Sequence, residues 1–587
     1  MKKKKLWLLV IFGYLVLTVI FTYPLISNFA TAFPSDGGDA VQYLWNLWWT
    51  KYAVVNLKTS PFFSNYIYYP WGTSLLYNTF TPLRNFVSIP LQMIFGLIAA
   101  NNILIFASFI FSGFFMFLLA YELTKHRFAS FMAGFSYAFS PYVFAHLRGH
   151  YNFTSIELFP LLLLVLIKLW QKPNIKKAFF LGLILIGLLL TDYFYLFCGL
   201  LLVLIFIFFH LGHKNKIGNF LSYLFLSGAV LGIILLPLVV LLYYKSYLGN
   251  EFYRLGSDRY LTDLASFFIP HCTGLFWRSF FEKVNFPMNA ACGFDGSFTE
   301  GIVYLGFLPL LSVFMIFRRK KFLSTWQKFA FFGGVISMIL ALGDKLQFLG
   351  WATGVKLPYY LFSLIPFLRD FRVPSRIAVL TTLFFSLVLA FEFKEWLLKI
   401  KLRWKIILWS GIIFLVGLVD LLSTPILIEK RLAPDFYRQL RNKKKVTAIL
   451  DIPLGFWEDP GRSIYYQTVH QKPILGGLVS RLPRKPVELY RGYSLIRAVI
   501  DFQNKLYLDL DSEQKIVNVE LNDFLSPENS GLFRDQLAEL DIDYLILHNE
   551  FFEENKLEGL LFQLMDFFEV DLGLDLIYGD DKITVYQ

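Results

Sequence analysis

The chain has 587 residues, of which 56% are hydrophobic and 19% aromatic, and its mean hydropathy is +0.53. Soluble domains average roughly 45–50% apolar residues, and the excess here lies in repeated apolar runs before about residue 424. Because these runs are about long enough to cross a bilayer, the sequence predicts a polytopic α-helical membrane protein. The net charge of +12 conceals an asymmetry, since the first 500 residues hold 50 bases and 22 acids, whereas the last 87 hold 5 and 21. The bases gather in short loops between apolar runs, which indicates membrane orientation and argues against nucleic acid as a partner.

The sequence lacks the common motifs of soluble enzymes: there is no CxxC, HExxH, Walker A or GxSxG pattern. Of the three cysteines, Cys198 lies in an apolar run, whereas Cys272 and Cys292 share one polar loop. The latter two form a disulfide if the loop faces an oxidising compartment, and two unrelated thiols are the alternative.

The chain begins with Met1 and four lysines, followed by an apolar run from Leu6 to about Ile26. The letters ATA at 30–32 resemble a signal-peptidase site. The apolar run, however, is longer than the about 7–15 residues of a secretory signal. We therefore expect a retained anchor in the plasma membrane, with a cytoplasmic N-terminus.

Five basic clusters mark the side that we interpret as cytoplasmic. They are Lys125/Arg127, Lys172/Lys176/Lys177, Lys214/Lys216, Arg318–Lys321 and Lys394 to Lys405. About eleven spans follow, at 6–27, 102–123, 128–145, 153–170, 178–192, 193–211, 218–243, 301–318, 326–343, 375–393 and 406–424. The apolar run 83–98 is short and contains Pro90 and Gly96, so we expect it to lie in the interface or to re-enter. The alternative is that it spans and that the charge rule fails there.

This topology places the C-terminus and four loops outside the cytoplasm, namely 28–101, 148–152, 244–300 and 344–374. Residues 1–424 are predicted to form a transmembrane domain. Residues 425–587 are more charged and contain strand-like segments at 445–453, 543–549 and 582–587, with a helical segment at 535–542. We expect a soluble extracytoplasmic α/β domain there, joined by a linker at about 425–435.

The first external loop contains PSDGGDAVQYLWNLWW at 34–49, with Asp36 and Asp39 in a Pro/Gly-rich turn. If 39–57 is helical, one face carries Asp39, Gln42, Tyr43 and Asn46. The rest of the surface carries Trp45, Trp48 and Trp49. This pattern predicts a helix at the membrane interface with a polar stripe and an aromatic belt. A helix cap is the alternative role for Asp39.

Three further external segments carry candidate residues. In FLRDFRVPSRIAVL at 367–380, Arg372 and Arg376 flank a helix start, which favours an anion site. An ion-paired cluster, such as Arg372 with Asp370, is the alternative. In HLRGHYN at 146–152, His146, Arg148 and His150 suit phosphate binding or proton transfer, or are simply solvated. Glu300 directly precedes a span at the depth of Asp39, and Asp263 and Asp295 are further candidates, with solvated loop acids as the alternative.

Taken in order, these segments resemble the GT-C superfamily of membrane glycosyltransferases, and most closely its YfhO-like bacterial members. The resemblance rests on GGDAVQYLWNLWW after the first span, the segment ending AANN, TEGIVYLG, FRVPSR and ILDIPLG…YYQTVHQKPILGGLVSR at 449–481. It covers essentially the whole chain. Two features depart from the family: Asp36 and Asp39 are separated by Gly37 and Gly38, and the WWDYG pattern of oligosaccharyltransferases is absent.

The resemblance implies a polyprenyl-phosphate sugar donor at the outer leaflet and transfer of the sugar to an extracytoplasmic acceptor. It implies Asp39 as the catalytic base and Arg372 and Arg376 as phosphate ligands. From the residues themselves, we expect Glu300 to assist Asp39, and Arg148 and His150 to be further phosphate ligands. Tyr43, Asn46 and Trp45 are the expected sugar or acceptor contacts. A divalent metal (Mg²⁺ or Mn²⁺) is left open, with Asp36 and Asp39 as its expected ligands. The rival hypothesis is a non-catalytic lipid-handling protein, such as a flippase or scaffold in envelope polysaccharide assembly, which would use the arginines without Asp39.

Overall fold

The computed structural model describes residues 3–37, 39–76, 78–244, 252, 260–284, 286–287, 292, 299–318, 324–365, 368, 371–454, 461–511 and 529–587. Two residues considered above, Asp295 and Asp370, lie outside the described residues. Cys272 and Cys292 are joined in a disulfide.

An apolar helix bundle occupies the N-terminal part of the molecule, and a helix falls on each of the eleven predicted spans. These helices are α1 (Lys3–Phe21), α4 (Leu97–Thr124), α5 (Arg127–Ala138), α8 (Leu158–Gln171), α9 (Ile175–Thr191), α10 (Tyr193–His210), α11 (Lys214–Leu242), α14 (Phe307–Phe317), α15 (Thr325–Ala341), α18 (Ala378–Leu397) and α19 (Arg403–Leu421). Among the described residues, six helices are long and apolar enough to cross a membrane, namely α1, α4, α10, α11, α19 and α18 with the turn before it. The protein is therefore an integral membrane protein, while the number of crossings stays a prediction.

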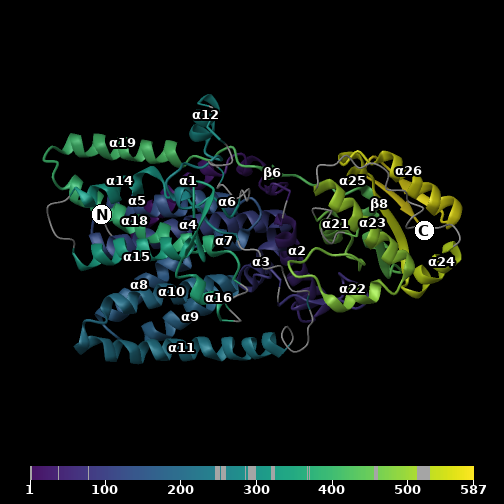
Figure 1. The fold of residues 1–587 in the computed structure, drawn as a ribbon, viewed down its shortest axis with the longest axis horizontal. Coiled ribbons are helices and arrows are strands. Elements are labelled where there is room, and N and C mark those ends of the chain that lie inside the picture. The colour runs from purple at the N-terminus through teal and green to yellow at the C-terminus, as the bar shows by residue number, and fades with distance from the viewer. Residues whose placement is uncertain are drawn as a thin grey trace.

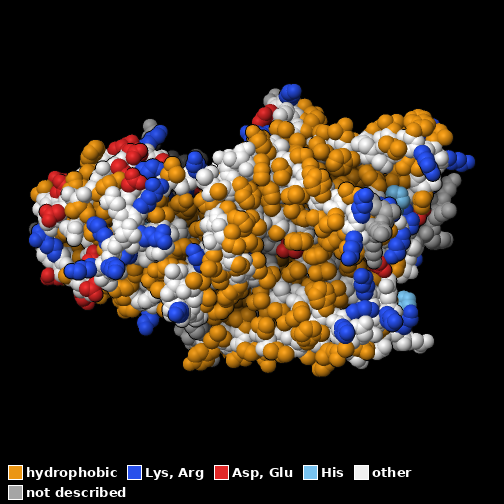
Figure 2. Space-filling view, turned by 180° about the vertical axis from the view of Figure 1, so that it is seen from behind, with side chains coloured by type: hydrophobic (Ala, Val, Ile, Leu, Met, Phe, Trp, Pro, Cys, Tyr) orange, Lys and Arg blue, Asp and Glu red, His pale blue; other side chains and the backbone are white. Residues whose placement is uncertain are grey.

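Charge divides the two ends of the bundle. The N-terminus lies at one end and the C-terminal residues at the other (Figure 1). Lysine and arginine side chains with few acidic ones gather at the end opposite the C-terminal residues, whereas the C-terminal lobe carries both basic and acidic side chains, and hydrophobic side chains cover much of the surface between (Figure 2). Lys125 after α4, Lys172 after α8 and Lys399 after α18 belong to the predicted basic clusters.

Small residues allow close helix packing in the bundle. A Cβ at Gly134 would lie 2.0 Å from Tyr14 Oη, and one at Gly113 would lie 2.8 Å from the same ring. The Tyr14 hydroxyl donates to the Phe131 carbonyl at 2.9 Å. Helix α1 can therefore approach α4 and α5 closely, as is typical of helices packed within membranes.

The short apolar run 83–98 forms helix α3 (Pro82–Phe95), which ends at Gly96 in the left-handed region, with φ of 83°. Its polar residues Arg84, Ser88 and Gln92 are buried, whereas Met93 and Ile94 are exposed. Helix α3 is not among the six helices above, and whether it spans stays a prediction.

Helix α2 (Ala40–Lys51) continues as the π-helical segment η2 (Tyr52–Leu57). The interfacial aromatic belt predicted here is wrong, because every residue from Ala40 to Thr50 is buried. Helix α2 packs against α3 and against α21 (Arg462–His470) from the C-terminal part of the chain. Trp45 Nε1 donates to Gln467 Oε1 at 2.7 Å, and Trp49 Nε1 donates to the Pro61 carbonyl at 3.1 Å. Protein, rather than lipid, therefore surrounds these rings.

Shorter elements connect the bundle helices. They are η1 (Leu25–Asn28), β1 (Phe33–Pro34), β2 (Phe63–Ser64), β3 (Thr73–Ser74), α6 (Pro141–His146), α7 (Tyr151–Thr154), η4 (Leu264–Phe267), α12 (Leu275–Lys283), β4 (Lys345–Phe348), β5 (Trp351–Lys356), α16 (Tyr360–Ser363) and η5 (Pro374–Ile377). Strands β2 and β3 form one antiparallel hairpin, and β4 and β5 form another.

The C-terminal lobe, residues 425–587, contains a four-stranded mixed sheet of order β7-β8-β10-β9. Strands β7 and β8 are parallel, with Ile452 opposite Leu547, and the other pairs are antiparallel. The remaining elements, in chain order with the strands, are β6 (Ile428–Glu429), α20 (Asp435–Asn442), β7 (Ala448–Ile452), α22 (Arg484–Tyr490), α23 (Ser494–Asp511), α24 (Ser530–Glu539), β8 (Ile542–His548), α25 (Asn549–Glu554), α26 (Glu558–Asp566), η8 (Phe567–Asp571), β9 (Leu576–Gly579) and β10 (Ile583–Tyr586).

The lobe is held to the loop that follows α1, residues 28–101, by backbone contacts. Strand β6 pairs with β1, with Ile428 opposite Pro34. The Ile474 N–H donates to the Tyr66 carbonyl at 2.9 Å, and the Tyr68 N–H donates to the Gly476 carbonyl at 3.1 Å. Gly476 has no room for a side chain, because a Cβ there would lie 1.5 Å from the Leu454 carbonyl oxygen.

We expect Gly476→Ala to lower the free energy of unfolding by about 1–3 kcal/mol, because the backbone at Leu454 must shift to admit the methyl group. The melting temperature of the purified protein should fall. Gly559→Ala, at an exposed position in α26 with open space around its Cβ, is the matched control and should leave the melting temperature unchanged or slightly higher. Equal melting temperatures for the two variants would contradict this packing.

Candidate active site

Asp39 stands at the N-cap position of α2, yet its carboxylate makes no capping hydrogen bond. Instead, Asp39 Oδ2 lies 3.2 Å from His150 Nε2. The Asp39 side chain is 47% exposed, more than any other member of the cluster described below. A carboxylate with one oxygen positioned by a histidine and an open side is suited to accept a proton from a bound molecule.

The loop between α6 and α7 brings His150 to Asp39. The Asp36 N–H donates to the Arg148 carbonyl at 3.2 Å, and the Tyr151 hydroxyl donates to the Pro34 carbonyl. Gly149 lies directly against the backbone of Asp39. A Cβ added at Gly149 would lie 3.5 Å from the Asp39 nitrogen. These contacts fix two segments that are more than a hundred residues apart in the sequence.

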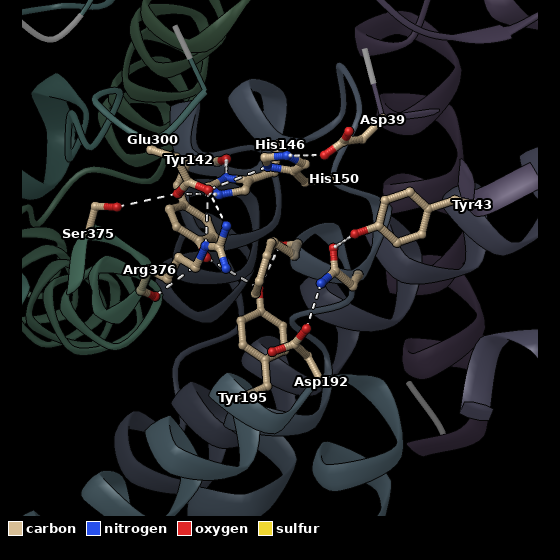
Figure 3. Close-up of polar contacts among 12 residues, drawn as sticks. Asp39, Tyr43, Tyr142, His146, His150, Asp192, Tyr195, Glu300, Ser375 and Arg376 are labelled. Atoms are coloured by element: carbon tan, nitrogen blue, oxygen red, sulfur yellow. Dashed lines mark hydrogen bonds and ion pairs between the residues drawn. The ribbon is translucent and has the colours of Figure 1, made fainter. Parts of the chain in front are cut away.

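Glu300 is the buried centre of the cluster (Figure 3). Its Oε1 accepts from Arg376 Nε at 3.0 Å and from Arg376 Nη2, and it lies 3.5 Å from His150 Nδ1. Its Oε2 accepts from Ser375 Oγ at 3.3 Å and lies 3.4 Å from His146 Nε2. Asp39, His150, Glu300 and Arg376 thus form one continuous polar network.

Arg376 belongs to the first turn before α18, in the segment η5. Its guanidinium lies over the Phe153 ring, 4.0 Å from the centroid, which adds a cation–π contact to the ion pair. Asp192 caps α10 by accepting from the Phe194 N–H at 2.7 Å. The two charged groups therefore lie where two membrane-crossing helices begin.

A second chain of hydrogen bonds runs from α2 to Asp192. The Tyr43 hydroxyl donates to Asn152 Oδ1 at 2.6 Å, and Asn152 Nδ2 donates to Asp192 Oδ2 at 2.7 Å. Figure 3 shows this chain beside the Glu300 cluster. Asp192, Asn152 and Ser375 received no role from the sequence. Asn152 and Ser375 lie in the quoted segments HLRGHYN and FRVPSR, and Asp192 is an acid between two apolar runs, but only the fold brings the three together here.

The network determines the charge of its members. Burial lowers the pKa of His150, but its hydrogen bonds with Asp39 and Glu300 outweigh burial and raise the pKa to about 9. Burial raises the pKa of Asp39, but the hydrogen bond and charge of His150, with the charge of Arg376, leave that pKa below its usual value. Burial likewise raises the pKa of Glu300, and Arg376 and the two histidines hold it well below the usual range. At neutral pH an imidazolium therefore bridges two carboxylates.

Three of these residues could instead hold a metal ion once His150 has lost the proton on Nδ1, since ligand atoms of His146, His150 and Glu300 lie within 4.8 Å of one another. His146 Nδ1 is paired with the Tyr142 carbonyl at 2.8 Å and His150 Nε2 with Asp39, so each ring turns its other nitrogen toward Glu300. Imidazoles oriented in this way by an outer oxygen are typical of metal ligands. The donor set fits a transition metal such as Zn²⁺ better than Mg²⁺. The expected ligands Asp36 and Asp39 are not in this group. Asp36 Oδ2 faces Arg148 Nη1 at 3.8 Å, and Asp39 contacts Nε2 of His150, the nitrogen that faces away from Glu300.

The remaining predicted residues lie around the cluster. Arg148 is positioned by its contact with Asp36, and Arg372 lies one turn before Arg376, with its carbonyl accepting from the Tyr260 N–H at 3.2 Å. Asp263 accepts from three backbone N–H groups, of Ala265, Leu349 and Gly350. It therefore holds a turn together.

The expected sugar contacts Tyr43, Asn46 and Trp45 are fully buried in α2. Tyr43 reaches the cluster through Asn152, whereas Asn46 Nδ2 donates to the Thr79 carbonyl at 3.0 Å and Trp45 binds Gln467. Direct contact with a sugar is not supported by this arrangement, because their polar atoms already bind protein groups.

Several solved structures resemble the chain. The archaeal oligosaccharyltransferase AglB from Archaeoglobus fulgidus, in complex with an inhibitory peptide and a dolichol-phosphate, is 13% identical, with 93% of this chain and 70% of that chain covered and a TM-score of 0.44. Arabinofuranosyltransferase AftD from Mycobacteria is 14% identical over 94% of this chain, which spans 35% of AftD, with a TM-score of 0.49. ArnT from Cupriavidus metallidurans bound to undecaprenyl phosphate is 11% identical, with 99% and 97% covered and a TM-score of 0.39.

These neighbours are GT-C glycosyltransferases, but TM-scores below 0.5 establish no more than a general likeness. The YfhO-like subtype is not confirmed and stays a prediction. No curated protein matches the chain. A family model described as a domain of unknown function, DUF6311, matches residues 10–421. Because that match covers well over half of the 587 residues, the protein belongs to the DUF6311 family.

Proposed function

We propose that this protein is a GT-C-type membrane glycosyltransferase that moves a sugar from a polyprenyl-phosphate donor to an extracytoplasmic acceptor. The observation that supports it most is the network Asp39–His150–Glu300–Arg376, which joins a half-exposed carboxylate to a guanidinium at the start of a membrane helix. Glycosyl transfer needs a base for the acceptor and positive charge for the departing phosphate. An amphiphilic donor needs both groups close to the membrane surface.

The orientation follows from the charge of the two ends. We place the basic end of the bundle in the cytoplasm, because lysine and arginine are retained on that side of a membrane. The network then lies on the outer side, with the C-terminal lobe above it. We treat residues 1–424 and 425–587 as separate domains, and we assign the lobe the role of covering the site or binding the acceptor.

In the proposed reaction the Asp39 carboxylate takes the proton of the acceptor hydroxyl while the hydroxyl oxygen bonds to the anomeric carbon. The bond between that carbon and the donor phosphate oxygen breaks, and its electron pair leaves with the polyprenyl phosphate. Arg376 stabilises the added negative charge, since only its Nε and Nη2 bind Glu300. Glu300 and His150 keep Arg376 and Asp39 in position, and His146, His150 and Glu300 would hold a divalent ion that supplies further positive charge.

Asp39→Asn should lower turnover about 10²–10⁴-fold, because the amide cannot accept the proton. The assay supplies polyprenyl-phosphate sugars to the purified protein and measures release of polyprenyl phosphate. Asp36→Asn is the matched control, since Asp36 is exposed and pairs with Arg148 outside the cluster, and it should stay near wild type. Equal turnover in Asp39→Asn and wild type would show that Asp39 is not the catalytic base. Lipid binding without turnover on any donor would favour the flippase or scaffold hypothesis.

Glu300→Gln should destabilise the protein by about 3–5 kcal/mol, because it leaves the Arg376 charge buried beside a neutral group. The double variant Glu300→Gln, Arg376→Met removes both charges and should recover most of the melting temperature without recovering turnover. Recovery of both stability and turnover would show that the pair is structural only, which contradicts its proposed role.

The proposed metal site can be tested by metal analysis after dialysis against Zn²⁺ or Mn²⁺. We expect one ion per chain in the wild type and less than one in His146→Gln, whose ring nitrogen toward Glu300 is lost. Asp36→Asn should bind as the wild type does. Loss of the ion in Asp36→Asn but not in His146→Gln would instead assign the metal to the carboxylates of the first loop.

A further inference from the structure

Helix α12 projects from the side of the helix bundle near the end of α19 (Figure 1). Its first residue is fixed to that end, since the Leu275 N–H donates to the Leu422 carbonyl at 2.8 Å. Trp277 Nε1 donates to Asp420 Oδ1 at 2.9 Å, and Asp420 lies in the last turn of α19. Because α19 is one of the six helices that can cross a membrane, α12 begins at the membrane surface on the side of the C-terminal lobe.

Most of the surface of α12 falls into three stripes along its length, with two exceptions: exposed Lys283 lies beside Phe276, and exposed Leu275 lies beside Glu282. Trp277 and Phe281 face the protein, where Phe281 packs in a small apolar cluster with the Cys272–Cys292 disulfide. Arg278 and Glu282 are exposed and form an ion pair at 3.0 Å. Phe276 and Phe280, with Val284 just after the helix, are each about half exposed. At 100° per residue, this apolar stripe lies roughly opposite the charged one.

The apolar stripe lies next to an exposed apolar surface of α19 that would face lipid if α19 crosses the membrane. Leu415, Val416 and Val419 on α19, next to the attachment of α12, are exposed apolar residues of a membrane-crossing helix. An amphipathic helix with aromatic residues on one face and charges on the other is typical of helices that lie in the membrane interface. The same stripe in water would leave a contiguous apolar patch exposed.

A second element with the same character lies on another side of the bundle. The hairpin β4–β5 precedes α16 in the chain, and α16 lies on the side of the bundle away from α12 (Figure 1). Its turn is fixed by Asp263, which accepts from the Leu349 and Gly350 N–H groups at 3.1 and 2.7 Å. Phe348, Leu349 and Trp351 are exposed, and Trp351 is 79% exposed.

We propose that α12 lies in the interfacial layer of the leaflet on the side of the C-terminal lobe. Phe276, Phe280 and Val284 point toward the acyl chains, and Arg278 and Glu282 point toward the headgroups and water. The β4–β5 hairpin is a second anchor at the same level. Together these elements fix the height of the bundle in the membrane, and the proposal does not depend on the catalytic function.

The test uses spin labels on full-length protein in vesicles of phosphatidylethanolamine and phosphatidylglycerol. A nitroxide is attached at Phe280→Cys in a Cys198→Ala background, without reductant, so that the disulfide stays intact. Glu282→Cys, two residues away on the charged stripe, is the matched control. Power saturation then compares collisions with oxygen, which partitions into lipid, and with a water-soluble nickel complex.

We expect the label at 280 to collide mainly with oxygen and the label at 282 mainly with the nickel complex. A label at 280 that meets the nickel complex as often as the label at 282 would show that α12 stands in water, where a soluble partner would have to cover it, and would overturn the proposal. Phe276→Cys, on the same stripe one turn earlier, provides an independent reading if Phe280→Cys does not fold.

Discussion

Glu300 and Arg376 meet in the buried centre of the site, and the other polar contacts there are arranged around this ion pair. A buried pair of this kind is costly to desolvate and is retained only when further hydrogen bonds satisfy both groups. Here Ser375 and the two histidines satisfy the carboxylate, and the Phe153 ring covers the guanidinium. His150 links the pair to Asp39, which is the most exposed carboxylate of the cluster. The contact with His150 positions the Asp39 side chain and favours its ionised form.

The site also depends on how the first external loop is enclosed. Helix α2 is buried between α3 and the C-terminal lobe, and its first residues lie against the loop that carries His150. Contacts of the lobe with residues 66–69 hold α2 from the outside, while Tyr43 links it to Asn152 and Asp192 on the inside. The lobe therefore supports the position of Asp39 even though none of its residues enters the cluster shown in Figure 3.

The sequence predicted those parts of the fold that depend on local pattern. Apolar runs and basic loops located a helix at every expected span, and segments rich in Val, Ile and Tyr located strands β7, β8 and β10. The convergence of Asp39, Glu300 and Arg376 could be anticipated because the sequence predicts each of them close to the end of a hydrophobic run on one side of the membrane. The prediction of an aromatic belt from the tryptophans of α2 was wrong, because aromatic residues that pack against lipid and those that pack against protein have the same sequence spacing. Asp192 and Asn152 could not be identified, because their role exists only after distant loops have packed together.

The same ambiguity applies to α12, for which we propose the interfacial position that was expected of α2. Both segments combine aromatic and polar residues, and only tertiary contacts decide which face remains exposed. Helix α12 and the cluster both lie at the ends of membrane-crossing helices, which is where a lipid-linked phosphate would be reached from the membrane.

The most direct test of this account is a cryo-EM structure of the protein in lipid with a polyprenyl phosphate bound. The account predicts that the phosphate lies within hydrogen-bond distance of Arg376, on the side of the network where Asp39 is exposed. A phosphate bound elsewhere, with the Asp39–His150–Glu300–Arg376 network closed off from it, would contradict the account.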